Sequence, residues 1–323
     1  MSDDPSSEAR NLLRIIVDRT TELTPLKAVA TKAIQLAEDE RSAAMDLAAV
    51  LSSDQALTAK LLRLSNSAYY GYARRISNVR EAVILLGMRT VRSVAIASSI
   101  IDAFKTPEIK GFDRDLLWAH SVCVGLVAEA ISRHTRVAQP EDAFTAGVLH
   151  DVGKLAMLLT EPKRFEEVVR LVHRGMSYHE AEHEAFEGIG HEHVGARLAN
   201  RWKFPEELIS AIRWHRPEEL PRRLDSLVDV VAVANHACNR EGFASGFDWV
   251  REPGRRPIMP LPRQAREAIN VLHGGMATIE AKGRTFLQHV TTRPPHWYRT
   301  AAEEPGIESE EHRGDSKPNS DAA

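Results

Sequence analysis

Two adjacent polar residues, His150 and Asp151, interrupt an otherwise apolar helical stretch, "AGVLHDVGKLAMLL", over residues 146–159. A histidine and an aspartate in such a setting are costly unless a metal ion or a hydrogen-bond network satisfies them. Imidazole nitrogen and carboxylate oxygen are suitable ligands for a divalent transition metal. We therefore treat this pair as a candidate metal site. Lys154 follows one helical turn after His150 on the same face, where it could neutralise a phosphate.

Further polar residues occupy positions where apolar ones are expected, on other helices. His120 lies between "LLWA" and "SVCVGLV", His193 begins "HVGARLANRW", His215 ends "AIRWH" and Asn235 is embedded in "VVAVANHAC". Ligands from separate helices can converge in the core of a bundle. Spacing alone leaves a metal site and a set of hydrogen-bonded core histidines equally open, because 14 histidines make chance placement easy. The stretches "HEAEHE" and "HEH" are expected to be mostly solvated.

The elements that must position these residues are helices. Nearly every periodic segment has helical spacing, and alternation with strand-forming residues is almost absent, so the sequence predicts an all-α fold. Helix boundaries carry recognisable signals. Asp54 and Asn78 are predicted N-caps, Thr24 is a predicted cap with Pro25 at the first helical position, and Gly87 is a predicted stop.

The chain divides into segments of different character. A Pro/Gly-containing link over residues 106–112 separates two helical lobes, and residues 242–262 form a long loop rich in Gly, Pro and Arg before a final helical pair over about 263–289. The predicted organisation is an N-terminal extension (1–19), one domain (20–238) with lobes at 20–105 and 112–238, a loop with C-terminal helices (239–290), and a disordered polar tail (300–323).

Composition excludes several classes of protein. Lys and Arg number 42 against 45 Asp and Glu, a net charge of −3, which argues against direct nucleic-acid binding. The two cysteines, Cys123 and Cys238, lie in apolar runs and indicate a reducing compartment without a disulfide framework. The acidic N-terminus is no signal peptide, and no apolar run approaches the roughly 18 to 20 residues of a membrane span. We expect a soluble, cytoplasmic protein.

One aromatic and basic stretch, "NSAYYGYARRIS" over residues 66–77, has two interpretations. It could be a loop that docks a partner or stacks a nucleotide, since aromatic and Arg residues dominate binding hot spots. Alternatively, its first residues end a helix and its tyrosines fill the gap between lobes; we favour this structural role. The residues concerned are Asn66, Tyr69, Tyr70, Tyr72, Arg74 and Arg75.

The motifs taken together resemble a known family. "HDVGK", with a histidine thirty residues upstream, resembles the HD superfamily of metal-dependent phosphohydrolases. "LLRLSNSAYYG" followed by "ISNVREAVILLGMRTVRSVAIASS" is similar to the signature of the HDOD domain, the HD-related output domain of bacterial signalling proteins. "HVGARLANRWKFPEELISAIRWHRP" resembles the closing helices of that domain. The resemblance covers residues 20–238 and implies an N-terminal helical lobe packed on an HD-like helical bundle.

The resemblance also implies roles for single residues. His120, His150 and Asp151 match the first three ligands of the HD metal site, and Asn235 falls where the superfamily has its last aspartate. His193 and His215 match histidines that the related HD-GYP phosphodiesterases use for additional ions. The matches suggest Fe, Mn or a similar divalent metal.

Three departures from that pattern weaken the case for catalysis. Arg216 follows His215 where HD-GYP enzymes have a second histidine, "RPEELPRRL" replaces the Gly-Tyr-Pro motif, and position 235 carries a neutral amide. A two-metal phosphodiesterase site is therefore not expected. The sequence predicts a regulatory signalling protein that binds a partner protein or a nucleotide-type small ligand without turnover. The alternative is a metal-dependent phosphohydrolase acting on nucleotides or cyclic dinucleotides, which would place the chain in cyclic di-GMP signalling.

Overall fold

The computed structural model describes residues 6–35, 40–67 (40–44 by their backbone only), 70–71, 74–217, 219–243, 245–247, 259–271 and 274–291. These residues are helical apart from turns, loops and one isolated bridge between Ile109 and Phe112, and they contain no strand. The expected all-α fold is confirmed. The predicted tail over 300–323 lies outside the described residues.

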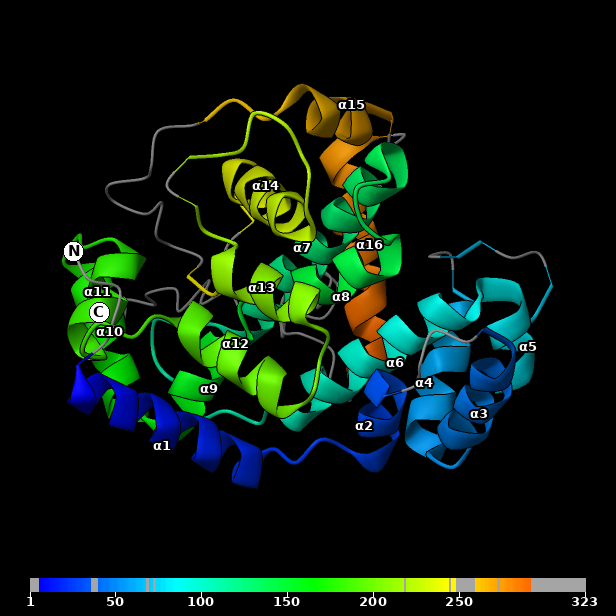
Figure 1. Ribbon diagram of the computed structural model, residues 1–323, viewed down its shortest axis with the longest axis horizontal. Coiled ribbons are helices and arrows are strands. Elements are labelled where there is room, and N and C mark those ends of the chain that lie inside the picture. The colour runs from blue at the N-terminus through cyan, green and yellow to red at the C-terminus, as the bar shows by residue number, and fades with distance from the viewer. Residues whose placement is uncertain are drawn as a thin grey trace, which may run out of the picture.

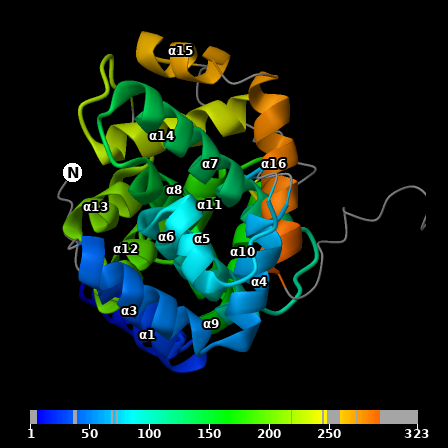
Figure 2. The same cartoon turned by 90° about the vertical axis from the view of Figure 1, so that its right-hand side faces the viewer.

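The described residues up to Ala103 form six helices, and α3, α4 and α5 project to the right in Figure 1, the side that faces the viewer in Figure 2. The N-caps expected at Asp54 and Asn78 are present: Asp54 Oδ1 accepts from Leu57 N at 2.9 Å and Asn78 Oδ1 from Glu81 N at 2.9 Å. The helices are α1 (Ser7–Leu23), α2 (Ala28–Gln35), α3 (Glu40–Ser52), α4 (Gln55–Ser65), α5 (Val79–Leu86) and α6 (Met88–Ala103).

Thr24 does not begin a helix as expected but ends one. Its backbone N–H and its hydroxyl both donate to Thr20 O, at 2.8 and 2.7 Å, so it closes α1. The next helix, α2, begins only at Ala28. A threonine next to a proline is compatible with either side of a helix boundary. The length of α1, set by the apolar face that it packs against α9 and α12, decides between them.

The described residues from Arg114 onward form a helical bundle and two helices that cover it. The helices are α7 (Arg114–Thr135), α8 (Pro140–Leu149), α9 (Val152–Thr160), α10 (Pro162–His173), α11 (Tyr178–Ala185), α12 (His191–Arg201), α13 (Glu206–Trp214), α14 (Leu227–Arg240), α15 (Arg263–Val271) and α16 (Gly275–Val290). In Figure 1 the last two enclose α7 from the top and the right, and α16 also packs against α4 of the first lobe. Buried apolar residues of all these helices form one hydrophobic core.

The central helix, α7, is apolar over most of its length. Contrary to the expectation that no apolar run approaches this length, α7 is the continuous helix among the described residues that is long and apolar enough to span a membrane. However, 72% of that stretch is buried inside the fold. The α5–α6 pair passes the same test only as a span bent by 119°. Helix packing therefore accounts for the apolar surface of α7.

Two glycines let the α7 and α8 backbones touch. A Cβ atom on Gly147 would lie 2.5 Å from the Gly125 Cα, and one on Gly125 would lie 2.8 Å from the Phe144 carbonyl oxygen. Any larger residue at either position would force the helices apart. Because His120 is on α7 and His150 follows α8, this close approach sets the separation of the two histidines.

Candidate metal centre

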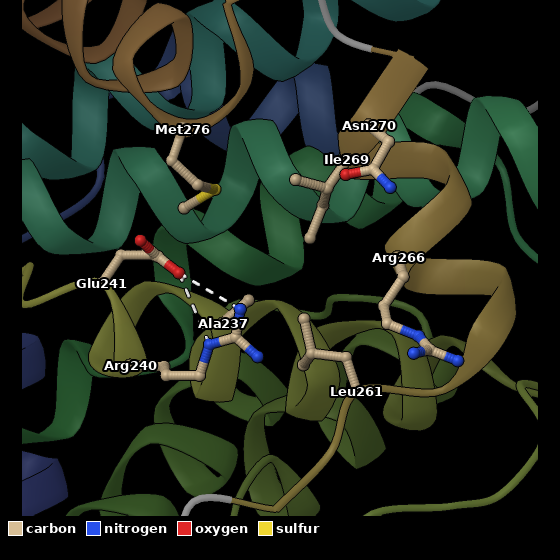
Figure 3. A pocket seen from close by; sticks show the side chains of 8 residues that line it. All are labelled: Ala237, Arg240, Glu241, Leu261, Arg266, Ile269, Asn270 and Met276. Carbon is tan, nitrogen blue, oxygen red and sulfur yellow. Dashed lines mark hydrogen bonds and ion pairs between the residues drawn. The ribbon is translucent and has the colours of Figure 1, made fainter.

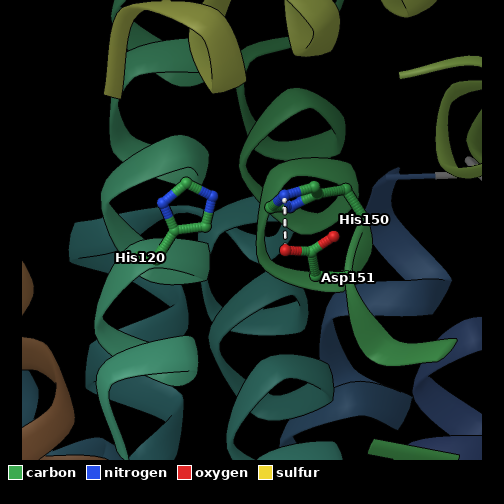
Figure 4. A group of neighbouring side chains, drawn as sticks. All are labelled: His120, His150 and Asp151. Atoms are coloured by element: carbon green, nitrogen blue, oxygen red, sulfur yellow. Dashed lines mark ion pairs between the residues drawn. The ribbon is translucent and has the colours of Figure 1, made fainter. Parts of the chain in front are cut away.

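The first group of site residues comes from α7, α14 and the junction of α8 with α9. His120, His150, Asp151 and Asn235 are exposed by 1, 0, 3 and 8% respectively. Figure 4 shows the His120 ring on α7 beside the His150–Asp151 pair, with the two imidazole centroids 5.4 Å apart. His120 Nε2 lies 3.1 Å from Asn235 Oδ1. The structure thus brings together all four residues that the sequence analysis named as principal ligands.

The His150–Asp151 pair lies in a turn and not, as expected, in the middle of a helix. α8 ends at Leu149 and α9 begins at Val152. His150 Nδ1 donates to the Gly147 carbonyl oxygen at 2.7 Å, so the side chain replaces a backbone partner at this break. The turn brings the two side chains together, with His150 Nε2 3.3 Å from Asp151 Oδ2.

Three buried histidines share one hydrogen-bonding arrangement. Each donates its Nδ1–H to a backbone carbonyl oxygen, which leaves the Nε2 lone pair directed into the site, as is usual for metal-binding histidines. The pairs are His120 with Phe243 at 3.0 Å, His150 with Gly147 at 2.7 Å, and His215 with Ile212 at 2.7 Å.

The unsatisfied acceptors in this group fit a bound cation. His150 Nε2 is fully buried without a hydrogen-bond partner and faces the Asp151 carboxylate. Asn235 Oδ1 already accepts a hydrogen bond from Asn239 Nδ2 at 2.8 Å. The Nε2 lone pair of His120 therefore faces an oxygen that is also an acceptor. A buried acceptor without a partner, such as His150 Nε2, costs about 1–3 kcal/mol. A divalent transition metal coordinated by these atoms would remove that cost, and the donor set suits one.

A second group shares the Asp151 carboxylate. His191 Nε2, at the start of α12, lies 3.0 Å from Asp151 Oδ1, and His215 Nε2, at the end of α13, lies 3.7 Å from the same oxygen. The two Nε2 atoms are 3.3 Å apart. On its other side His191 Nδ1 contacts Glu182 Oε2 at 2.7 Å, and Glu182 Oε1 accepts from the Tyr178 hydroxyl at 3.0 Å. A carboxylate behind a histidine in this way orients the ring and raises its basicity as a ligand.

His191 was not among the predicted ligands, although the sequence carries a signal for it. Along α12, residues 191, 194 and 198 share one face, and Val194 and Leu198 are both fully buried. Gly153 explains how this face reaches Asp151. A Cβ atom on Gly153 would lie 1.9 Å from the His191 carbonyl oxygen, so the glycine of "HDVGK" allows α12 to begin directly against α9.

His193, which the sequence analysis considered as an additional ligand, lies outside both groups. Its Nδ1 accepts from Gly190 N at 3.2 Å and its Nε2 contacts Arg213 Nη2 at 2.8 Å. The side chain is half-buried on the other side of α12, together with the exposed Arg197. An offset of two residues, about 200° around the helix, thus places His191, and not His193, in the site.

Buried charge is unbalanced around the two groups. Asp151, Glu182 and Glu192 are buried carboxylates, and Lys154 and a protonated His191 offset two of their three negative charges. Burial raises the pKa of Asp151, but His150 and Lys154 outweigh it and hold the pKa well below its usual value. Burial lowers the pKa of His191, yet Glu182 and Asp151 raise it to about 9. An additional cation would be stabilised here.

His120 and His215 favour the neutral form of the imidazole ring. Burial, with the neighbouring His150 ring, lowers the pKa of His120 to about 3. Burial and the His150 and His191 rings hold the pKa of His215 well below its usual value. Neutral imidazole is the form that binds a metal.

Comparison with known proteins identifies the family. The model of the HDOD domain matches residues 23–217, more than half of the chain. The chain belongs to the HDOD domain family. That range includes His120, the His150–Asp151 pair, His191 and His215, while Asn235 lies beyond its end.

Several known proteins are similar to this chain. An HDOD domain protein of unknown function from Geobacter sulfurreducens has a TM-score of 0.67 and 27% identity, over 86% of this chain and 98% of that one. A protein from Shewanella amazonensis SB2B, described as a candidate phosphohydrolase, has a TM-score of 0.65 and 23% identity, with the same coverage. An uncharacterized protein of Treponema pallidum (strain Nichols) is 26% identical over 232 residues, which span 71% of this chain but 44% of that protein.

The Lys154 side chain lies in the interior of the HDOD domain. Its Nζ donates to Asp151 Oδ2 at 2.7 Å and lies 4.7 Å from the centre of the Tyr178 ring. The residue is 4% exposed. The expected contact with a phosphate would therefore require this buried ion pair to open.

The aromatic and basic stretch of the HDOD domain is held by Asn66. The Asn66 side chain donates to the Leu62 and Ile76 carbonyl oxygens, both at 2.8 Å, and accepts from Ile76 N at 2.7 Å. Asn66 therefore ends α4 and ties the two ends of the loop together. Arg74 Nη2 is 2.7 Å from Glu81 Oε1, Arg75 is exposed, and Tyr70 packs against the core. Tyr69 and Tyr72 lie outside the described residues.

Proposed function

We propose that this HDOD protein is a regulatory signalling module that acts by binding a partner protein or a nucleotide-type small ligand, without phosphoester hydrolysis. We further propose that its HD-like lobe holds a divalent transition metal such as Fe or Mn. The candidate ligands are His120, His150, Asp151 and Asn235 in one group and Asp151, His191 and His215 in the other.

The main support for this proposal is that the candidate ligands are buried away from solvent. None of the six candidate ligand side chains is more than 8% exposed. Hydrolysis of a phosphoester requires substrate and water to reach the ion. In this structure an ion at the centre would instead be enclosed, where it would hold the ends of several helices in one arrangement.

The chemistry of individual residues supports the same conclusion. The Lys154 ammonium, 2.7 Å from Asp151 Oδ2, is already paired with that carboxylate. Asn235 contributes a neutral oxygen that already accepts from Asn239. When bound, the metal would supply positive charge to the buried carboxylates; the surrounding residues hold their rings and carboxylates in place for it.

The alternative, a metal-dependent phosphohydrolase acting on nucleotides or cyclic dinucleotides, rests on one specific observation. Three imidazole Nε2 atoms, from His150, His191 and His215, lie within 3.7 Å of a single carboxylate, Asp151. His120 offers a fourth imidazole to the same group. Such a set exceeds what one enclosed structural ion needs. It leaves room for a second ion and a bound water if the site opens.

A metal analysis combined with a turnover screen tests both functions. Purified protein, as isolated and after reconstitution with Fe²⁺ or Mn²⁺, is assayed against nucleotide and cyclic dinucleotide phosphoesters. The same assays are run on a His150→Ala/Asp151→Ala variant. The proposal expects bound metal in the wild type, loss of metal in the variant and no turnover in either. Steady hydrolysis that disappears in the variant would overturn it in favour of the phosphohydrolase.

A further inference from the structure

A small cavity lies between three helices that each pack against α7: the end of α14, α15 and the start of α16. Its volume is about 140 Å³, and Figure 3 shows the side chains that line it. All of them lie beyond residue 217, where the match to the family model ends, and none is a candidate ligand of the metal centre. We call this space the α14–α16 cavity.

Apolar side chains form the inner surface of the α14–α16 cavity. Leu261, Ile269 and Met276 point toward its middle in Figure 3, and Ala237 of α14 adds to the lining. Ile269 and Met276 are half-buried and so still present apolar surface to water. An apolar group that fills the space removes that surface from water, which favours binding. The inside of the cavity therefore suits a hydrocarbon ring or chain.

Hydrogen bonds fix two of the walls of the cavity. His236 Nε2 on α14 donates to the Met259 carbonyl oxygen at 3.1 Å, which holds the segment that carries Leu261. At the start of α15, Gln264 Oε1 accepts from Leu224 N at 3.1 Å. Because these elements are already held in place, a ligand would not have to order them on binding.

The rim of the cavity is polar and carries an excess of positive charge. Arg240 Nη2 lies 3.3 Å from Glu241 Oε1, so the charges of these two side chains offset each other. Arg266 and Asn270 are exposed and lie one turn apart on α15. Within the part of the chain that the structure describes, neither side chain makes a hydrogen bond or an ion pair. Among the described residues of the rim, the Arg266 guanidinium thus remains without a carboxylate.

We infer that the α14–α16 cavity binds a small organic carboxylate, with the carboxylate on Arg266 and the apolar part of the ligand against Ile269 and Met276. A guanidinium pairs with a carboxylate through two parallel hydrogen bonds, a geometry that fixes the ligand as well as its charge. The Asn270 amide supplies a further donor beside it. The inference depends neither on the regulatory function proposed above nor on a bound metal.

The volume limits the ligand to about one ring. An apolar cavity of roughly 150 Å³ accommodates benzene, whereas pockets for drug-sized ligands measure roughly 300 Å³ or more. A nucleotide is therefore too large for the 140 Å³ of this cavity. Benzoate, which joins one ring to one carboxylate, matches the volume, the apolar lining and the charge of Arg266.

The cavity is close to the candidate metal centre but separate from it. Both involve α14, on which Asn239 Nδ2 of the turn before Arg240 donates to Asn235 Oδ1 at 2.8 Å. Asn235 belongs to the centre and Arg240 to the cavity, and no residue contributes to both. Removal of metal from the centre should therefore leave the cavity able to bind its ligand.

Methyl NMR of the full-length protein tests the inference. The methionine methyl groups are isotopically labelled, the Met276 resonance is assigned with a Met276→Leu variant, and benzoate is added. We expect the Met276 resonance to shift until it saturates, with a dissociation constant on the order of 1 mM. The resonance of Met45 on α3 should not move. Benzamide, which has the same ring without the charge, should bind at least about tenfold more weakly.

Two variants and one treatment separate the possible results. Arg266→Gln should weaken benzoate binding at least about tenfold because the bidentate pair is lost, and the exposed position makes unfolding unlikely to interfere. Arg263→Gln, an exposed change on the same helix outside the cavity, should match the wild type. Protein stripped of metal by a chelator should also bind benzoate, so failure of the proposed centre and failure of the cavity give different results. A Met276 resonance that does not move at the highest soluble benzoate concentration, or equal binding of benzoate by Arg266→Gln, or of benzamide by the wild type, would overturn the inference.

Discussion

Replacing Gly153 with alanine tests how the candidate centre is assembled. The added methyl group would lie 1.9 Å from the His191 carbonyl oxygen, whereas a relaxed carbon–oxygen contact is about 3.3–3.6 Å. Because the atom in the way is backbone at the start of α12, no side-chain rotation relieves the clash. The variant must separate α9 from α12 by roughly 1.4 Å or more.

The cost follows from this displacement. Overpacking of a well-packed interior costs about 1–3 kcal/mol and sometimes more, and a rigid backbone contact places Gly153→Ala at the upper end, about 3 kcal/mol. For a chain of 323 residues that corresponds to a decrease in Tm of about 4 °C. The same movement takes His191 away from Asp151, so the metal content should fall with the free energy of unfolding.

Gly195→Ala is the matched control, because it adds a methyl group to the same pair of helices. Its nearest neighbour is a side-chain methyl, Ile212 Cγ2 at 2.9 Å, and not backbone, so a much smaller shift relieves the contact than at Gly153. The gain in helix propensity, up to about 1 kcal/mol, offsets part of the strain. Thermal unfolding and metal analysis of both variants test whether the close approach of α9 and α12 assembles the centre. If Gly153→Ala melts within 1 °C of the wild type and retains its metal, the close approach of α9 and α12 does not assemble the centre.

Two further predictions concern the polar interior. Glu182→Gln keeps the size of the side chain but removes the carboxylate behind His191, so we expect metal retention against a competing chelator to weaken by about 10–100-fold, and unchanged retention would show that Glu182 does not orient the ring. Burial lowers the pKa of His120 to about 3 and that of His179 to about 4. Their unfolded forms take up protons below about pH 6.5 and their folded forms do not, so metal-free protein should lose stability as the pH falls from 6.5 to 4. In urea denaturation at several pH values, His179→Gln should flatten this dependence, and an equally steep one in that variant would contradict it.

The sequence by itself predicted what depends on short-range interactions. Helical periodicity decides the all-α fold, and the caps at Asp54 and Asn78 use hydrogen bonds between residues three apart, so both could be recognised without the structure. The motifs of the HDOD family could likewise be recognised in the amino-acid sequence alone. Thr24 marks the limit of such signals, since the same residue suits either side of a helix boundary.

Tertiary structure decided which polar residues meet and whether they are accessible. His191 and His193 are two positions apart in the sequence, and only the packing of α12 against α9 determines that His191 faces Asp151. The commitment of Lys154 to Asp151 and the burial of every candidate ligand depend in the same way on helices distant in the sequence. Periodicity shows that a helix has an inner face, but the distance between two inner faces depends on the side chains of both, here on a glycine that lets the backbones touch.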